Sequence, residues 1–219
     1  MLSSMFFKEY TKTRVGIIAT IVVIMAVIIS SIVSLSHDIR IMSATQFLSM
    51  RVVSGWTVSQ LLKVIPIVAG VVLAIVQYVP EAAYGRLKLT LHLPLKENEI
   101  IAMMCVYGWL VLVVMTVVSI LVLTIMEMQY LPIEMVGRDI SEAVRWSMCS
   151  LVAYNFTTSC TLERQTGGRI RWGLTGLAVI GALFLLPRAA METYIFTIVF
   201  VILSSAAPFV SARRYKVGL

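Results

Sequence analysis

Runs of residues without charge alternate with short charged segments along the whole 219-residue chain. A helix that crosses a membrane needs about 20 mostly apolar residues, and six runs of this chain approach that length. The pattern therefore predicts an all-α, polytopic membrane protein with six transmembrane helices. The spans are expected near residues 15–36, 57–79, 99–126, 143–162, 170–187 and 193–212.

The fourth and fifth runs are the weakest. The fourth is the least apolar because it carries several serines, threonines and Asn155, and the fifth is short. Both could be re-entrant segments, which would still leave an even number of spans. Pro66 and Pro208 fall inside expected spans and are expected to kink them, since proline removes a backbone hydrogen bond.

The composition agrees with a membrane protein. Hydrophobic residues make up 59% of the chain, charged residues 13%, and the mean hydropathy is +0.94. A soluble domain carries about 25% charged residues, and one of this size has no interior for so much apolar surface. We therefore treat residues 1–219 as a single transmembrane domain. The net charge of +7 does not indicate nucleic-acid binding, because the basic residues form small clusters between apolar runs.

These basic clusters predict the orientation. With the N-terminus in the cytoplasm, twelve of the 18 lysines and arginines fall in cytoplasmic segments and six in external ones. Cytoplasmic loops of membrane proteins carry the excess of Lys and Arg, so both termini are expected in the cytoplasm. The cytoplasmic set is Lys8, Lys12, Arg14, Arg86, Lys88, Lys96, Arg164, Arg169, Arg171, Arg213, Arg214 and Lys216; the external set is Arg40, Arg51, Lys63, Arg138, Arg145 and Arg188. The second span extends back toward residue 57 only if Lys63 snorkels outward along it.

Residues 1–14 mix apolar side chains such as Phe6 and Phe7 with Lys8, Lys12 and Arg14. This mixture is typical of a short amphipathic segment that lies at the membrane surface. The apolar run that follows is too long for the core of a signal peptide, so we expect it to remain as the first span.

The longest cytoplasmic loop, residues 80–98, predicts a short amphipathic helix. Pro80 suits the first position of a helix, Glu81 suits its first turn, and Pro94 would end it. The strict alternation of leucines from Leu87 to Leu95 fits a strand better. An isolated strand at a membrane surface would leave its backbone unpaired, so we prefer the helix.

This loop resembles that of the permeases of type-2 ABC exporters. Their pattern has E-x3-G-x-L, an apolar stretch and L-x-x-P before the third span, and an N-terminal amphipathic segment precedes the first. The outline of six spans covers the whole chain, but the similarity is specific only over residues 81–101. The matching residues in this chain are Glu81, Gly85, Leu87, Leu91, Pro94, Leu95 and Lys96.

The resemblance implies a division of labour between chains. In that family the loop holds a coupling helix that docks into an ATPase subunit, so the ATPase-coupling residues would be Glu81, Gly85, Arg86, Leu87, Leu91 and Pro94. ATP and Mg²⁺ would bind to the partner ATPase, in a complex of two ATPases and two identical or similar permeases. One departure is the link between the fifth and sixth spans, which is too short for the helical hairpin that many members carry there.

The chain itself offers no enzymatic motif. Gly167-Gly168-Arg169 is not the G-x4-G-K-[ST] loop that cradles phosphates, and neither HExxH nor GxSxG is present. The only histidines, His37 and His92, are expected on opposite faces of the membrane. We therefore predict no catalytic residue, no metal site and no cofactor in this chain.

The polar residues of the fourth span have two interpretations. Tyr154, Asn155, Thr157 and Thr158 could line a translocation path. They could equally form hydrogen bonds to neighbouring helices, which is the usual role of such residues in lipid.

The sequence therefore favours the permease subunit of an ATP-driven exporter in a prokaryotic plasma membrane. The low charge of the spans favours a hydrophobic or amphipathic substrate. The alternatives are a membrane scaffold or assembly protein without transport activity and, last, a membrane enzyme.

Overall fold

A computed structural model describes residues 2–42, 46, 49, 61–83, 97–186 and 191–217. Within these ranges the chain forms helices and no strand, which confirms the all-α prediction. The helices are α1 (Leu2–Ile41), α3 (Leu61–Ala83), α5 (Glu97–Glu127), α6 (Ile133–Leu162), α7 (Thr166–Leu185), α8 (Met191–Ser205) and α9 (Ala207–Val217).

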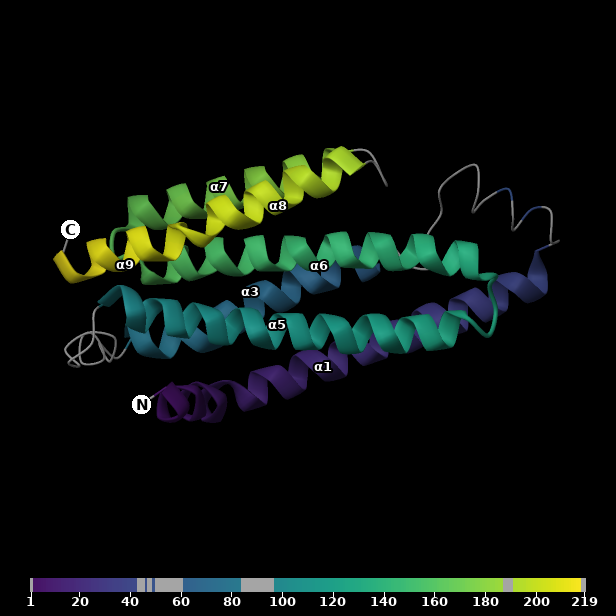
Figure 1. Ribbon diagram of the computed structural model, residues 1–219, viewed down its shortest axis with the longest axis horizontal. Coiled ribbons are helices and arrows are strands. Elements are labelled where there is room, and N and C mark those ends of the chain that lie inside the picture. Colours follow the sequence, from purple (N-terminus) through teal and green to yellow (C-terminus); the bar gives the residue numbers. More distant parts are fainter. Residues whose placement is uncertain are drawn as a thin grey trace.

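The helices lie side by side along the long axis of the molecule (Figure 1), and α6 contacts α3, α5, α7, α8 and α9. Successive helices run in opposite directions, apart from α8 and α9, which follow one another along one line. Both chain termini therefore lie at the same end (Figure 1), which we call the termini end, and the opposite end is the far end. The helix ends Ala83 and Glu97, which flank the predicted coupling loop, also lie at the termini end.

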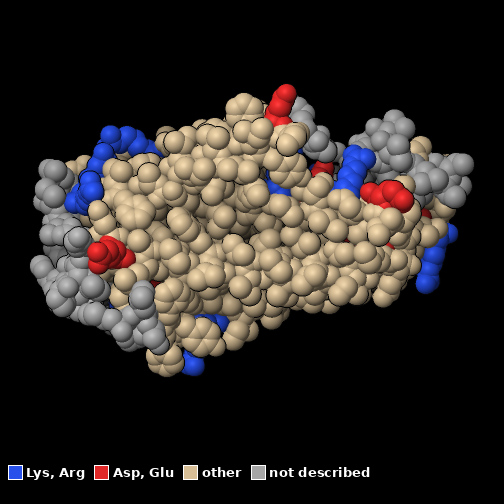
Figure 2. Space-filling model, viewed as in Figure 1, with Lys and Arg blue, Asp and Glu red and all other residues tan. Residues whose placement is uncertain are grey.

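Among the described residues, five helical stretches are long and apolar enough to cross a membrane: Met5–Ile41, Lys63–Ala83, Asn98–Glu127, Thr166–Leu185 and Met191–Tyr215. The fifth includes both α8 and α9. Figure 2 shows a face on which most charged side chains lie toward the two ends, with a largely uncharged surface between them. The chain therefore has the character of a membrane-embedded protein.

Helix boundaries differ from the expected spans at three places. The segment expected to lie separately at residues 1–14 is continuous with the first span in α1. Helix α6 begins at Ile133, ten residues before the expected start at 143. Helix α3 continues through Pro80 to Ala83, so Pro80 and Glu81 belong to its last turn and do not begin a new helix. Pro80 cannot donate to the carbonyl of Val76, four residues earlier, and the helix continues for three residues beyond it.

The break between α8 and α9 has a local cause. Pro208 has no N–H to donate to the carbonyl of Ser204, four residues earlier. The chain makes a turn at Ala206, whose N–H bonds to the Leu203 carbonyl at 3.3 Å. The expected effect of Pro208 on the last span is thus seen as a break two residues before it.

Glycines permit two close helix contacts. A Cβ atom added to Gly70 of α3 would overlap the backbone carbonyl of Ser150 on α6. One added to Gly108 of α5 would overlap the hydroxyl of Tyr154 on α6. Small residues at helix interfaces let backbones approach in membrane proteins, and both contacts place α6 in the core.

Candidate functional site

A buried carboxylate anchors α1 to α3 at the termini end. Glu81 is only 2% exposed, and its Oε1 accepts from Lys8 Nζ at 3.0 Å and from Lys12 Nζ at 3.3 Å. Lys12 also pairs with Glu9 at 2.9 Å. Two carboxylates and two ammonium groups thus form one cluster, and breaking such a buried pair leaves an uncompensated charge.

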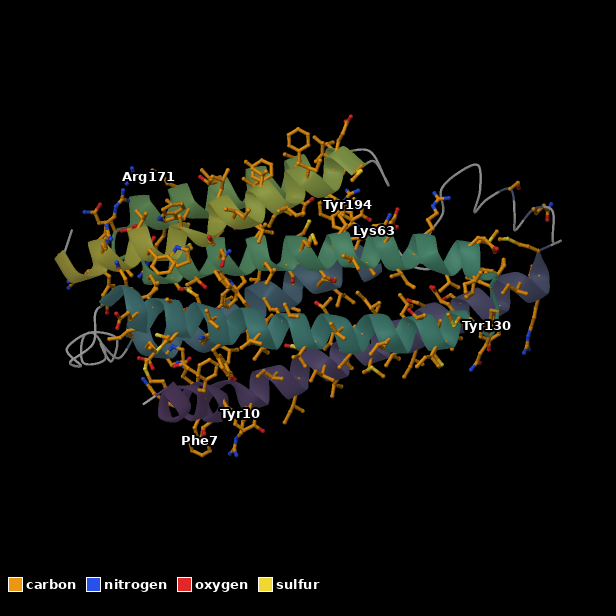
Figure 3. The ribbon with its side chains drawn as sticks, in the orientation of Figure 1. Phe7, Tyr10, Lys63, Tyr130, Arg171 and Tyr194 are labelled. Atoms are coloured by element: carbon orange, nitrogen blue, oxygen red, sulfur yellow. The ribbon has the colours of Figure 1, made fainter. Side chains whose placement is uncertain are left out.

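The same part of α1 is also attached to α5. The hydroxyls of Thr13 and Tyr107 lie 2.7 Å apart and are buried. The ring of Phe6 meets the Tyr107 ring edge-on, with centroids 5.8 Å apart. Phe7 and Tyr10, in contrast, point away from the bundle (Figure 3) and are exposed. The first turns of α1 therefore present one face to the bundle and an aromatic face to the surroundings.

A second buried carboxylate joins α6, α7 and α9 at this end. Glu163, which caps the C-terminus of α6, accepts from Trp172 Nε1 at 3.3 Å and lies 3.6 Å from the Arg214 guanidinium. Its backbone carbonyl accepts from Arg169 Nε at 2.7 Å. At the termini end, Glu81 and its basic partners thus join α1 to α3, and Glu163 with its basic partners joins α6, α7 and α9.

Buried charges also occur toward the far end. Lys63 of α3 lies 3.6 Å from Glu142 of α6, and both side chains are less than a tenth exposed. Arg145 donates to the Leu183 carbonyl of α7 at 2.9 Å. Tyr194 of α8 also contacts this part of α6, since its hydroxyl donates to the Ser141 carbonyl at 2.7 Å. The outward snorkelling of Lys63 that would extend the second span is not observed, because Glu142 offers this side chain a partner inside the protein.

The two charged layers are separated by one membrane thickness. From Lys63 to Glu81 along α3 is about 27 Å, and from Glu142 to Glu163 along α6 is about 32 Å, at 1.5 Å per residue. The hydrocarbon core of a bilayer is about 30 Å thick. The stretch of α6 between the layers, residues 146–162, contains no charged residue.

An uncharged polar network lies between these layers. The amide of Gln77 on α3 donates to the Met104 carbonyl of α5 at 2.9 Å and accepts from the Tyr154 hydroxyl at 2.7 Å. The Tyr78 hydroxyl lies 3.4 Å from Cys105 Sγ. These groups are all buried, and their bonds connect α3, α5 and α6 in the interior, where an unpaired polar group would be costly.

Asn155 extends this network to α8. Its Oδ1 accepts from Trp109 Nε1 at 2.8 Å, and its Nδ2 donates to Ser204 Oγ at 3.0 Å. Both ends of the amide are therefore bonded to neighbouring helices. The carbonyl of Ser204 is also the one to which Pro208, lacking an N–H, cannot donate. The network therefore reaches the last helical stretch at the break between α8 and α9.

The four residues predicted to line a translocation path differ in their exposure. Tyr154, Asn155 and Thr158 are fully buried in the bundle, and Thr157 is partly exposed. The bonds of Tyr154 and Asn155 match the alternative in which these residues join helices. A cavity between α1, α3, α5 and α6 is lined on α6 by other residues, Ala143, Ser147 and Ser150. The hydroxyls of Ser147 and Ser150 bond to carbonyls of their own helix, so this cavity is apolar.

Of the predicted coupling residues, only Glu81 lies within the described residues. Gly85, Arg86, Leu87, Leu91 and Pro94 lie outside them. Glu81 is positioned directly before this segment, but its carboxylate is turned into the α1–α3 contact. This carboxylate therefore joins the last turn of α3 to α1.

Sequence reasoning missed three groups: Gln77, Glu163 and the Lys63–Glu142 pair. A signal existed for two of them. Gln77 is a lone amide in an otherwise uncharged apolar run, and Asp139, Glu142, Trp146 and Cys149 follow helical spacing, which would have extended α6 toward its N-terminus. Glu163 resembled any other charged residue of a loop.

Comparison of this chain with protein families, with curated proteins and with solved structures finds no match.

Proposed function

We propose that this chain is the membrane-spanning permease subunit of an ABC-type exporter, with ATP hydrolysed by a separate ATPase chain. The observation that carries the proposal is the position of Glu81. It lies in the last turn of α3, directly before the loop that resembles a coupling loop, and it is ion-paired with Lys8 and Lys12 of α1. A force applied to that loop therefore reaches α3 and α1 together.

Helix α6 is the fourth of the six spans in this proposal and adds one to the five apolar stretches described above. Its charged residues lie in its first half, up to Arg145, and the following 17 residues up to Leu162 have none. The layer of buried charge at each end supports a bilayer between Lys63–Glu142 and Glu81–Glu163. With six spans, both termini face the cytoplasm, as the distribution of basic residues predicts.

The mechanism follows from the connections at the termini end. Closure of two ATPase subunits on ATP would displace the loop between Ala83 and Glu97, and with it the ends of α3 and α5. The Glu81 cluster carries the displacement into α1, and the Thr13–Tyr107 contact ties α1 to α5. These three helices would then move against α6 and change the side to which the cavity between them opens.

The substrate class is inferred from the lining of that cavity. Ile24, Ile28, Leu112 and Met115 line it with apolar groups, so a hydrophobic or amphipathic molecule fits better than an ion. The expected location is a prokaryotic plasma membrane, where such a permease pairs with a second, identical or similar, permease chain.

The test is to purify the chain from its native membranes and to ask whether an ATPase with a P-loop accompanies it. The purified chain alone should not hydrolyse ATP, because it lacks a phosphate-binding loop. Gly85→Trp in the loop should reduce ATPase recovery at normal membrane levels. Gly137→Trp is the matched control at the far end, where an added Cβ atom meets no described atom within 4 Å.

Two results would count against the proposal. Robust ATP hydrolysis by the isolated chain would end the two-subunit scheme. Recovery without any ATPase from membranes that retain the intact protein would favour the scaffold alternative.

A further inference from the structure

A cavity of about 620 Å³ opens at the termini end between α3, α6, α7 and α9. Its two sides differ in chemistry. The side formed by α3 is apolar, whereas α6, α7 and the link between them contribute two arginines, a threonine and a cysteine. The lining residues are Val79, Ala82, Ala83, Cys160, Thr161, Arg164, Arg169 and Tyr215.

The two arginines are available to a ligand. No hydrogen bond or ion pair joins the Arg164 guanidinium to any described residue. Arg169 uses its Nε to donate to the Glu163 carbonyl, which leaves its two terminal nitrogens for another acceptor. The carboxylate of Glu163 does not neutralise them, because it faces Trp172 and Arg214.

The sequence that follows Ala83 adds no acidic residue before Glu97. The loop that leaves Ala83, residues 84–96, contains Arg86, Lys88 and Lys96 and no aspartate or glutamate. Among the described residues that line the cavity, two are arginines and none is an aspartate or glutamate, so the lining carries an excess of positive charge. An external anion would relieve this excess.

We propose that this cavity binds the phosphate of an anionic phospholipid headgroup. Arginine presents a rigid fork of N–H donors that matches phosphate oxygens in bidentate fashion. The apolar side formed by Val79 and Ala82 would contact the glycerol and the first acyl carbons, which free phosphate lacks. Anionic lipids attract basic segments at the cytoplasmic surface, and the termini end is the end expected to face it.

Cys160 gives a direct readout, because it lines the cavity and is partly exposed while Cys105 and Cys149 are buried. The intact protein is reconstituted in phosphatidylcholine vesicles with increasing phosphatidylglycerol content, and the rate of Cys160 alkylation by N-ethylmaleimide is measured. Phosphatidylglycerol is expected to slow the reaction. Cys160→Ser identifies the background from the other two thiols.

Variants separate the site from the charge of the vesicle surface. Arg164→Gln should raise the phosphatidylglycerol content needed for half-protection about tenfold, because the variant loses a charge-assisted hydrogen bond to the phosphate; tenfold corresponds to about 1.4 kcal/mol. Arg171→Gln is the matched control. Arg171 is exposed, lies at the same end of α7 (Figure 3) and does not line the cavity, so its loss should leave protection unchanged.

Three outcomes would overturn the proposal. The first is equal alkylation in vesicles with and without phosphatidylglycerol. The second is protection that Arg164→Gln leaves intact or that Arg171→Gln removes equally. The third is equal protection by inorganic phosphate added to phosphatidylcholine vesicles, which would make this a site for a free anion. The assay requires neither an ATPase nor transport, so its result is independent of the proposed function.

Discussion

Replacement of Gly70 by alanine tests whether the α3–α6 contact holds the bundle together. The added methyl group would overlap the Ser150 carbonyl oxygen and lie 3.1 Å from its carbonyl carbon. These are backbone atoms of a helix, so they cannot rotate away as a side chain could. Helices α3 and α6 must therefore separate locally, and the Gln77–Tyr154 bond further along the same interface would be stretched.

The magnitude follows from comparison with a glycine in open space. Overpacking of this kind costs about 1–3 kcal/mol. Alanine also gains up to about 1 kcal/mol of helix propensity over glycine, and that gain is common to any helical position. Gly181 of α7 has nothing within 4 Å of an added Cβ, so Gly181→Ala carries the gain without the clash. The difference between the two variants isolates the cost of the contact.

The assay is thermal unfolding in detergent, followed with a thiol-reactive fluorogenic dye. Cys105 and Cys149 are buried and report unfolding. Gly70→Ala is expected to unfold roughly 3–10 °C below Gly181→Ala, at about 2–4 °C per kcal/mol for a chain of this size. Equal unfolding temperatures would refute the close α3–α6 contact.

Three further predictions concern the polar clusters. Glu81→Gln should release the start of α1 and speed trypsin cleavage there, whereas Glu134→Gln, at an exposed site, should not; equal rates would show that the ion pairs do not hold α1. Lys63→Met and Glu142→Gln should each destabilise the protein more than the double variant does, because each single change leaves a buried charge; additive losses of unfolding temperature would contradict their pairing. Asn155→Leu should lower stability by about 0.6–2 kcal/mol, the range for interhelical hydrogen bonds in membranes; unchanged stability with lost transport would instead identify Asn155 as part of the path.

Much of the helical layout was predictable from sequence. The uncharged runs located α3, α5 and α7 to within a few residues, since charge is costly in lipid. The start of α6 was missed for the same reason. The number of charged residues between Ile133 and Arg145 is typical of a loop, so the segment was not recognised as helix. In the structure Glu142 is stabilised by Lys63, which lies 79 positions earlier in the chain.

Long-range pairing of this kind explains most of what sequence reasoning did not supply. Glu81 has several possible basic partners in the sequence, and only the packing of α1 on α3 selects Lys8 and Lys12. Asn155 was identified as important from its type alone. Whether it faced a path or a neighbouring helix depended on the positions of Trp109 and Ser204, which no local pattern encodes.

The continuity of α1 sets a constraint of helical phase. Glu9 and Thr13 face the bundle near its start, and Ile24, Ile28 and Leu35 face it further along. Each residue advances the helix by about 100°, so one residue inserted between Thr13 and Ile24 would turn one group away from the bundle when the other is docked. An insertion of about a full turn would restore both. Because α1 is one continuous helix, a rotation of its N-terminal cluster about the helix axis also rotates the apolar residues near Leu35. The two groups can contact the bundle together only in one rotational setting of the helix.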